Sequence, residues 1–389
     1  MNVAIAYDCL YPFTIGGAEK YYRGLAERLA RRHRVSFLTR EQWPAGDPPQ
    51  IAPNVEVVAV CGPSSLYGDG GRRRIEPTLA YGLGLFRHLA RHRHDYDVVH
   101  VASFPFFSVL AARAARLLGG PCYVVDWLEV WSRAGWQTYL GGRRASIGRA
   151  IQQLCIRLSD VPVVHSELHA RRLAAAGARP RLLRGLYEGS AESIPETRTS
   201  ATRASLAVFA GRHIPEKGVA AIPEAVAIAR RDVPDLEALV FGDGPERPRV
   251  EREVARLGLE GVVRCEGFAS ESALHAALGR AMCLLLPSAR EGFGLVVVEA
   301  AAFGTPSIVL RAPESAATEL IAPGENGIVI DAAEPAAIAR ALVEASRRRA
   351  DLVASTADWF GRNVHELSID ASIAALEGIY SEAERSLSR

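Results

Sequence analysis

Two glutamates, Glu291 and Glu299, bracket the stretch of this chain whose residue types most directly suggest chemistry. Between them lie a Gly-Phe-Gly turn and an apolar run, and the eight-residue spacing would span about 12 Å of helix, a little over two turns. Glycines at positions 292 and 294 would let backbone N–H groups approach a ligand closely, and the helix start that follows favours negative charge. The stretch therefore predicts an anion-binding site whose ligand is a phosphate group. The distance between the two glutamates is long enough for a diphosphate at one end and a ribose at the other.

A second, cationic set consists of Arg212 and Lys217, which follow the apolar run of residues 206–210 and precede a helical pattern. The chain contains only one other lysine, Lys20. An arginine offers a planar fork and a lysine a compact point charge, so together they could hold one diphosphate at a strand end. Two exposed loop charges are the alternative, but the position of one of only two lysines favours a functional role.

These groups must be positioned by the apolar runs that precede them. Residues 281–286 form a continuous hydrophobic run closed by Pro287 and Ser288, as in a fully buried parallel strand. Further strand-length runs alternate with helical patterns in both halves of the chain, at residues 3–7, 35–38, 55–60, 98–102, 121–125, 161–165, 206–210, 239–241, 306–310 and 327–330. This alternation predicts an α/β fold with doubly wound parallel sheets, in which ligands bind at the carboxyl ends of the strands.

At 389 residues the chain is too long for one ordinary core and suits two domains. Residues 191–205 are rich in Ser, Thr, Pro and Glu and lack an apolar period, as in an interdomain linker. The predicted division is therefore a first domain at residues 1–190, a linker at 191–205, a second domain at 206–360 and a C-terminal helix at 361–389.

The composition argues against several classes of protein. A net charge of +2 gives no reason to expect a nucleic-acid partner. The six cysteines form no C-x-x-C pair, so we expect reduced core residues of a cytoplasmic protein instead of a disulfide framework or metal site. No apolar run approaches twenty residues, which argues against a membrane span. A basic amphipathic pattern at residues 142–159 leaves open a weak peripheral contact with anionic lipid, although such a face is usually only solvated.

Acidic, aromatic and imidazole side chains follow two strands of the first half. The loop at residues 126–136 combines Asp126 and Glu129 with three tryptophans, and aromatic faces beside carboxylates suit a sugar or another flat acceptor; a packed loop is an equally good interpretation. His100 ends another strand and could face the same site or be a satisfied core histidine. The Asp95-Tyr-Asp97 sequence resembles a divalent-metal site, but capping the start of a buried strand is the favoured interpretation.

The order and spacing of these motifs resemble glycosyltransferase family 4, whose members are retaining enzymes with the GT-B fold, over nearly the whole chain. The two glutamates alone would be a weak signature. Four motifs together make it specific, namely Gly16-Gly17-Ala-Glu, Gly211-Arg212-(x)4-Lys217-Gly218, Gly242-Asp-Gly-Pro and Pro287-Ser-(x)2-Glu291-Gly-Phe-Gly-Leu. The resemblance implies a GT-B architecture of two Rossmann-like doubly wound domains facing a central cleft. The first domain would bind the acceptor, the second the nucleotide sugar, and the terminal helix would cross back to the first.

The family resemblance implies a role for each matching residue. Catalysis would rest on Arg212 and Lys217, which match the diphosphate-binding pair, and on Glu291, which would grip the donor sugar. The other implied donor-binding residues are Gly16, Gly17, Gly267, Phe268, Gly292, Phe293, Gly294, Leu295 and Glu299, the last of them on the ribose hydroxyls. The implied donor is a UDP- or GDP-linked sugar. No metal or other cofactor is expected, because the helix terminus and the Arg/Lys pair would neutralise the leaving diphosphate.

One position departs from the family pattern. Many members carry a histidine at about the position of Leu128, where it contacts the acceptor or sugar, whereas this chain offers His100, Asp126 and Glu129 as acceptor-side candidates. The implied reaction is still retaining transfer of a sugar to a hydroxyl acceptor, such as a glycolipid, a polysaccharide precursor or a secondary metabolite. The alternatives are a GT-B epimerase or phosphorylase, or a non-catalytic subunit that binds nucleotide sugar.

Overall fold

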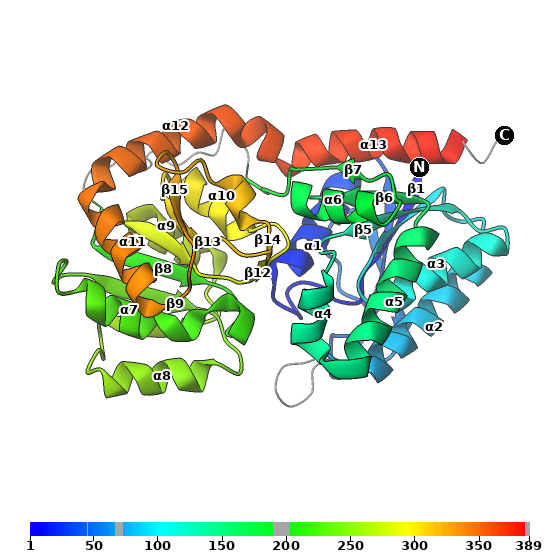
Figure 1. Cartoon of the computed structure of the whole chain (residues 1–389). Helices are drawn as coiled ribbons and strands as arrows, with labels where there is room; N and C mark the ends of the chain where they lie inside the picture. Colours follow the sequence, from blue (N-terminus) through cyan, green and yellow to red (C-terminus); the bar gives the residue numbers. More distant parts are fainter. Residues whose placement is uncertain (45, 67–72, 190–202, 386–389) are drawn as a thin grey trace. The chain divides into compact units, whose positions relative to one another are not determined.

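The computed structural model describes residues 1–44, 46–66, 73–189 and 203–385 of the chain (Figure 1). It contains two compact units, Met1–Glu188 with Ser368–Arg389 (unit 1) and Gly189–Leu367 (unit 2), and each unit has its own main sheet. The predicted linker at residues 191–205 lies almost entirely outside the described residues.

Unit 1 is built on a seven-stranded parallel sheet with the order β3-β2-β1-β4-β5-β6-β7. Its strands are β1 (Asn2–Ala6), β2 (Arg34–Arg40), β3 (Val55–Cys61), β4 (Val98–Ala102), β5 (Cys122–Trp127), β6 (Val161–Val164) and β7 (Arg181–Leu182). Its helices are α1 (Gly17–Leu29), α2 (Ile75–Arg91), α3 (Phe107–Leu117), α4 (Arg133–Leu140), α5 (Gly142–Leu158), α6 (Glu167–Ala175) and α13 (Ile369–Arg385). The order reverses between β1 and β4, which is the arrangement of a Rossmann-like sheet.

Burial on both faces explains why the central strands of unit 1 form a covered sheet. Every residue of β4 and β5 is buried, so helices must lie on both sides of them. Helix α13 supplies part of this cover, because it packs against α1, β4 and β5 and buries Leu376 and Tyr380. A small residue brings α2 close to β3, since a Cβ on Gly84 would lie 2.1 Å from the Val60 carbonyl oxygen.

Unit 2 has a six-stranded parallel sheet with the order β10-β9-β8-β11-β13-β15 and a two-stranded ribbon of β12 and β14. Its strands are β8 (Leu206–Ala210), β9 (Glu237–Phe241), β10 (Val263–Gly267), β11 (Cys283–Leu286), β12 (Arg290–Glu291), β13 (Ser307–Leu310), β14 (Glu314–Ser315) and β15 (Gly327–Ile330). Its helices include α7 (Ile222–Ala229), α8 (Arg247–Arg256), α9 (Glu271–Arg280), α10 (Leu295–Ala302), α11 (Pro335–Arg347) and α12 (Arg349–Leu367), with 3-10 turns η3 (Pro215–Lys217), η4 (Val219–Ala221) and η5 (Ala317–Leu320). Both main sheets are doubly wound and parallel, so the predicted fold class is confirmed.

The end of the chain differs from the single helix predicted at residues 361–389. Helix α12 already begins at Arg349 and ends at Leu367, and α13 begins only after a break at Ser368. The Ile369 N–H donates to the Tyr187 carbonyl at 2.9 Å and is therefore unavailable for the hydrogen bond that would continue α12. A tertiary contact sets this boundary, which a local pattern does not reveal.

Candidate active site

The predicted donor residues of unit 2 meet at the carboxyl ends of two adjacent strands. Strands β8 and β11 are neighbours, and the loops that follow them are residues 211–218 and 287–294. Gly218 has a left-handed φ of 66°, and a Cβ there would lie 2.5 Å from the Pro287 carbonyl oxygen. The Ala289 N–H also donates to the Glu216 carbonyl at 2.8 Å. Only glycine fits where these two loops touch, both because of the left-handed backbone and because there is no space for a Cβ, and this explains the glycine that follows Lys217.

Two ion pairs join the same loops. The Lys217 ammonium lies 2.5 Å from Glu291 Oε1, and the Arg290 guanidinium lies 2.8 Å from Glu216 Oε1. The side chains of Lys217 and Glu291 are only 16% and 13% exposed, so solvent screens their attraction less than at an open surface. The structure thus brings together two predicted site residues that are 74 positions apart in the chain.

Glu291 is fixed through both its backbone and its side chain. Strand β12 pairs with β14, and the Glu291 carbonyl accepts the Ala316 N–H at 2.9 Å. The Glu291 carboxylate is engaged by the Lys217 ammonium, which also lies 3.5 Å from the Arg290 carbonyl oxygen. A carboxylate held in this way can orient the ammonium, and this favours a role in donor binding over nucleophilic attack.

Helix α10 begins at the end of the predicted glycine turn, Gly292 to Leu295. Its N-cap, Gly294, has a left-handed φ of 100°, and a Cβ there would lie 3.0 Å from the Ala317 Cβ. No side chain of the described residues caps this helix start, so its first backbone N–H groups are available to an anion. Phe293 is buried beneath the turn, and Glu299 is half-buried further along the helix.

Three further predicted donor residues lie along the same edge of the sheet. Arg212 is exposed in the loop after β8. Gly267 ends β10 with φ 66°, and its carbonyl accepts the Gly242 N–H at 2.6 Å. Phe268 follows it and is 51% exposed. Because β9 separates β10 from β8, Phe268 lies further along this edge than the Lys217–Glu291 pair.

His213 is a residue of this edge that the sequence motifs did not single out. It is fully buried, and its backbone exchanges hydrogen bonds with the next loop, from its own N–H to the Asp243 carbonyl at 2.8 Å and from the Glu246 N–H to its carbonyl at 2.9 Å. Burial is the main reason that the pKa of His213 lies below its usual value. These two backbone hydrogen bonds fix the loop that carries Arg212. Its place between Arg212 and Lys217 was the only signal available in the sequence.

In unit 1 the predicted glycine pair begins helix α1. Gly16 has an extended backbone, with φ 177°, which any residue can adopt. Glycine is needed there because a side chain would be crowded, since a Cβ would lie 2.3 Å from Glu19 Oε2. Glu19 folds back under this turn and accepts a hydrogen bond from the Tyr7 hydroxyl at 3.0 Å. A Cβ on Gly17 would meet nothing within 4 Å, so Gly17 leaves open space at the helix start.

His100 and Asp126 belong to a buried network in the core of unit 1. His100 Nε2 lies 3.1 Å from Asp126 Oδ2, and His165 Nε2 lies 2.8 Å from Asp126 Oδ1. The Tyr380 hydroxyl of α13 lies 2.8 Å from His100 Nδ1. Neither His100 nor Asp126 has any exposed surface. The structure therefore favours the core-histidine interpretation of His100 and places both side chains where an acceptor has no surface to touch.

The hydrogen-bond partners fix the protonation of this network. His165 Nδ1 contacts the Leu183 carbonyl oxygen, and His165 Nε2 contacts the Asp126 carboxylate. Both partners are acceptors, so both ring nitrogens donate and the ring is an imidazolium. His100 needs one N–H, on Nε2, because its Nδ1 can accept from Tyr380. Burial alone would lower the pKa of His165, but the Asp126 charge and the hydrogen bonds raise it. Burial alone would raise the pKa of Asp126, but the charge and hydrogen bonds of the histidines hold it well below its usual range.

The tryptophan-rich loop is packed against α5 of its own unit. Gln152 accepts the Trp131 backbone N–H at 3.0 Å, donates to the Trp131 carbonyl at 2.9 Å and accepts the Trp136 indole N–H at 3.3 Å. The Glu129 carboxylate accepts the Trp131 indole N–H at 2.5 Å and is half-buried beside Leu128. These contacts support the packed-loop interpretation for the tryptophans, whereas an acceptor role for Glu129 stays a prediction.

The aspartates that resemble a divalent-metal site serve the fold. Asp97 accepts the Asn2 backbone N–H at 2.7 Å, and Asp95 lies 2.8 Å from His92 Nδ1. Across the described ranges, no three His, Cys, Asp or Glu side chains converge on a position that could hold a metal ion.

Two family models match consecutive parts of the chain. Residues 16–185 match the glycosyl transferase 4-like domain, and residues 191–356 match glycosyl transferases group 1. Among curated proteins, the chain is similar to the D-inositol 3-phosphate glycosyltransferase of Streptomyces coelicolor, with 30% identity over 48% of this chain and 42% of that protein. That match spans less than half the relative's length. The protein of the same name from Corynebacterium urealyticum is 28% identical over 84% of this chain and 81% of its own.

A solved structure extends the similarity of fold to the whole chain. The structure of Anabaena HepE in complex with UDP and glucose has a TM-score of 0.70 and 18% identity, covering 98% of this chain and all of that one. From the two consecutive family matches and the shared fold, the chain belongs to glycosyltransferase family 4, the GT-B enzymes that its motifs predict.

Proposed function

We propose that this transferase moves a sugar from a nucleoside diphosphate to a hydroxyl acceptor with retention at the anomeric carbon. The observation that carries the proposal is the Lys217–Glu291 pair beside the uncapped start of α10. An ammonium and free backbone N–H groups at adjacent strand ends suit a diphosphate. The HepE complex with UDP and glucose, a protein of similar fold, is consistent with a nucleotide-sugar donor.

In the proposed reaction the bond from the anomeric carbon to the diphosphate oxygen breaks while a bond to the acceptor oxygen forms on the same face. The acceptor proton passes to the leaving diphosphate. Lys217, Arg212 and the start of α10 stabilise the negative charge that develops on this group, so no metal or cofactor is required. Glu291 holds Lys217 in place, and Glu299 binds the ribose hydroxyls.

The donor base can be identified by ligand-induced stabilisation. We expect one of UDP, GDP, ADP and dTDP to raise the melting temperature most, with UDP or GDP as the expected best ligand, because a nucleotide that binds only the folded chain adds about 2.7 kcal/mol at a hundred times its dissociation constant. Differential scanning fluorimetry at matched nucleotide concentrations measures this. No shift with any of the four would contradict the proposed function.

Incubation without acceptor separates the alternatives. If the chain were an epimerase, incubating the nucleotide-sugar donor with the nucleoside diphosphate would yield an epimerised sugar. If it were a phosphorylase, release of the sugar would depend on inorganic phosphate. A non-catalytic subunit would bind nucleotide but leave the donor unhydrolysed.

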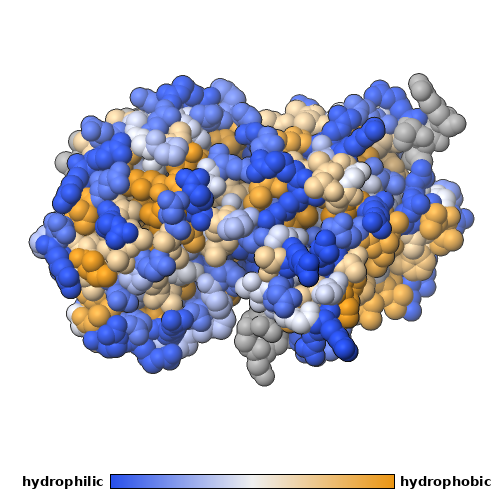
Figure 2. All heavy atoms as spheres, viewed as in Figure 1, coloured by the Kyte–Doolittle hydropathy of each residue, from blue (hydrophilic) through white to orange (hydrophobic). Residues whose placement is uncertain are grey.

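We also propose that unit 1 makes a peripheral contact with anionic lipid. No helix of the described chain is long and apolar enough to cross a membrane. Figure 2 shows an apolar area over α2 and α3, which lie side by side, and α3 also packs against α5. Exposed apolar side chains of these helices and of the residue after α3 are Ile75, Leu79, Leu83, Leu117, Leu118, Ile147 and Leu154, each 45–70% exposed. The exposed arginines of α5 add charge complementary to an anionic surface.

Cosedimentation with vesicles tests this contact. We expect the chain to pellet with phosphatidylglycerol-containing vesicles and not with pure phosphatidylcholine. Leu79→Ser with Leu83→Ser should weaken partitioning about tenfold or more, because each buried leucine contributes about 1.5–3 kcal/mol. Equal sedimentation of this variant and the unchanged chain would refute the proposed surface.

A further inference from the structure

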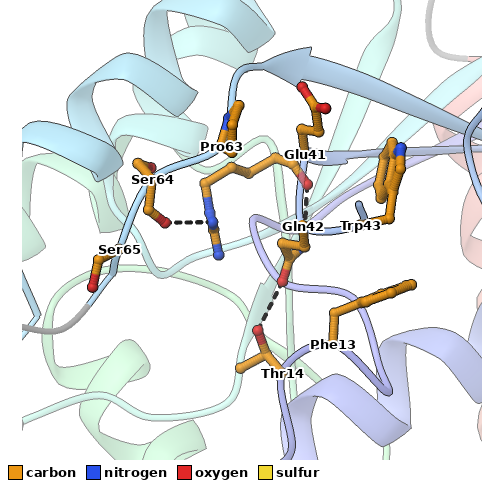
Figure 3. A pocket seen from close by; sticks show the side chains of 9 residues that line it. Phe13, Thr14, Glu41, Gln42, Trp43, Pro63, Ser64 and Ser65 are labelled. Atoms are coloured by element: carbon orange, nitrogen blue, oxygen red, sulfur yellow. Dashed lines mark hydrogen bonds between the residues drawn. The ribbon is translucent and has the colours of Figure 1, made fainter. Parts of the chain in front are cut away.

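A pocket lies in unit 1, where the loops after β1, β2 and β3 meet (Figure 3). It has a volume of about 450 Å³ and is open to solvent. Its lining residues are Phe13, Thr14, Arg40, Glu41, Gln42, Trp43, Pro63, Ser64 and Ser65. None of these residues was a candidate from the sequence, and the predicted acceptor candidates His100 and Asp126 lie buried elsewhere in the same unit.

The aromatic side chains of this pocket are placed to contact a ring. The Phe13 and Trp43 ring centroids are 6.3 Å apart, and the rings are inclined at 58°. Phe13 is 40% exposed, whereas Trp43 is largely buried. In the view of Figure 3 both lie on one side, and Ser64 and Ser65 lie on the other. An aromatic pair of this kind offers apolar faces to the C–H groups of a saturated ring.

Gln42 holds the loop that carries these groups. Its Oε1 accepts the Thr14 hydroxyl at 2.7 Å and the Leu10 N–H at 3.3 Å. Its Nε2 donates to the Thr39 hydroxyl at 3.2 Å and the Arg40 carbonyl at 3.1 Å. All of these polar positions are used within the fold, so Gln42 shapes the pocket and leaves ligand recognition to its neighbours.

Two charged side chains of opposite sign remain to meet a ligand. Arg40 is only 6% exposed and donates to the Ser64 carbonyl at 2.6 Å, while its Nε has no hydrogen-bond partner among the residues that the structure describes. The Glu41 carboxylate has no hydrogen-bond or ion-pair partner within the described part of the chain. The negative charge of Glu41 would repel an anionic ligand, and the positive charge of Arg40 would repel a cationic one. An uncharged ring avoids both repulsions, because one of its hydroxyl groups can accept a hydrogen bond from Arg40 and another can donate to Glu41.

We propose that this pocket binds the acceptor through an uncharged, hydroxylated saturated ring, either a sugar or a cyclitol, packed against the exposed Phe13 ring beside Trp43. The inference rests on the proposed transferase function and assigns its acceptor class. Glu41 accepts ring hydroxyl protons, and Arg40 donates to ring oxygens. A phosphorylated ring is disfavoured because its charge would lie beside the Glu41 carboxylate.

Saturation-transfer NMR on the full chain, with the best nucleoside diphosphate present, tests this acceptor class. The probes are methyl α-D-glucopyranoside, D-glucosamine and glucose 6-phosphate at equal concentration. We expect the largest transfer to the neutral probe, and transfer about fivefold lower or more in Phe13→Ala and Glu41→Gln. Phe13 is exposed and Glu41 is half-buried, so neither change empties the core. Glu56→Gln, an exposed glutamate of β3, is the matched control and should behave as the unchanged chain does.

The outcomes separate this inference from the proposed function. Nucleotide binding is measured in the same samples by thermal shift. If the nucleotide binds and Phe13→Ala and Glu41→Gln leave transfer to the neutral probe unchanged, the acceptor assignment is overturned and the donor assignment stands. Stronger transfer to glucose 6-phosphate, or none to the neutral probe, also overturns it. Absence of nucleotide binding in the unchanged chain overturns the proposed function itself.

Discussion

Replacing Lys217 by alanine is expected to lower kcat by about a hundredfold or more, because removing one donor that stabilises developing charge typically costs that much. The Lys217 ammonium lies 2.5 Å from Glu291 Oε1 in a mostly buried pair at the start of the β12–α10 segment. An ammonium fixed in advance need not reorganise when charge appears on the leaving diphosphate. Arg212→Ala should act in the same direction, since its guanidinium follows the adjacent strand end.

Initial rates at saturating donor and acceptor measure this effect. Arg256→Ala is a matched control, because it removes a cation of the same unit that is exposed and paired with Glu253 on the surface of α8. Melting temperatures of all variants show whether the loss of Lys217, which leaves Glu291 without its ammonium, has unfolded the loop. A raised KM with unchanged kcat would mean that Lys217 binds ground state and transition state equally, and would contradict the charge-stabilising role.

Replacing Asp126 by alanine is expected to destabilise the chain by about 3–5 kcal/mol, the usual cost of removing one partner from a buried ion pair. The His165 imidazolium would lose its counter-charge, and His100 would lose its hydrogen-bond acceptor. Urea unfolding followed by circular dichroism gives this difference. Asp95→Ala is the control, because that aspartate pairs with a histidine at an exposed site and should cost about 1 kcal/mol or less.

The pH dependence of this effect follows from the two pKa directions. The raised pKa of His165 means that its contribution to stability is full below the ordinary histidine pKa of about 6.5 and is lost as pH rises through the raised value. The lowered pKa of Asp126 means that its contribution is lost only as pH falls through that lowered value, in strong acid. Asp126→Asn should therefore destabilise more at pH 6 than at pH 9. A difference that does not change with pH would show that His165 carries no charge.

The fold could be predicted because buried parallel strands carry an apolar signal that is local in the sequence. Runs such as residues 281–286 and 206–210 therefore indicated strands, and the glycines after them indicated ligand loops. The Lys217–Glu291 pair combines residues that motifs nominated separately. Their direct contact depends on β8 and β11 being neighbours, a long-range pairing that spacing does not encode.

The acceptor side could not be predicted in the same way. His100 and Asp126 are strand residues whose partners, His165 and Tyr380, come from distant segments, so their burial became apparent only in the fold. Glu41 and Trp43 lie in a short loop after β2, where no periodicity marks a residue as facing a pocket. The start of α12 was missed because an apolar pattern does not locate helix ends.

Isothermal titration calorimetry tests the central claim most directly. The best nucleoside diphosphate is titrated into the unchanged chain and into the double variant Arg212→Ala/Lys217→Ala. If the carboxyl edge of unit 2 holds the diphosphate through these cations, binding to the double variant should be about a hundredfold weaker or more, since each charge-assisted contact contributes about 1.5–3 kcal/mol. The nucleoside alone should bind both proteins equally. An unchanged dissociation constant for the diphosphate in the double variant would contradict the assignment of this edge as the donor site.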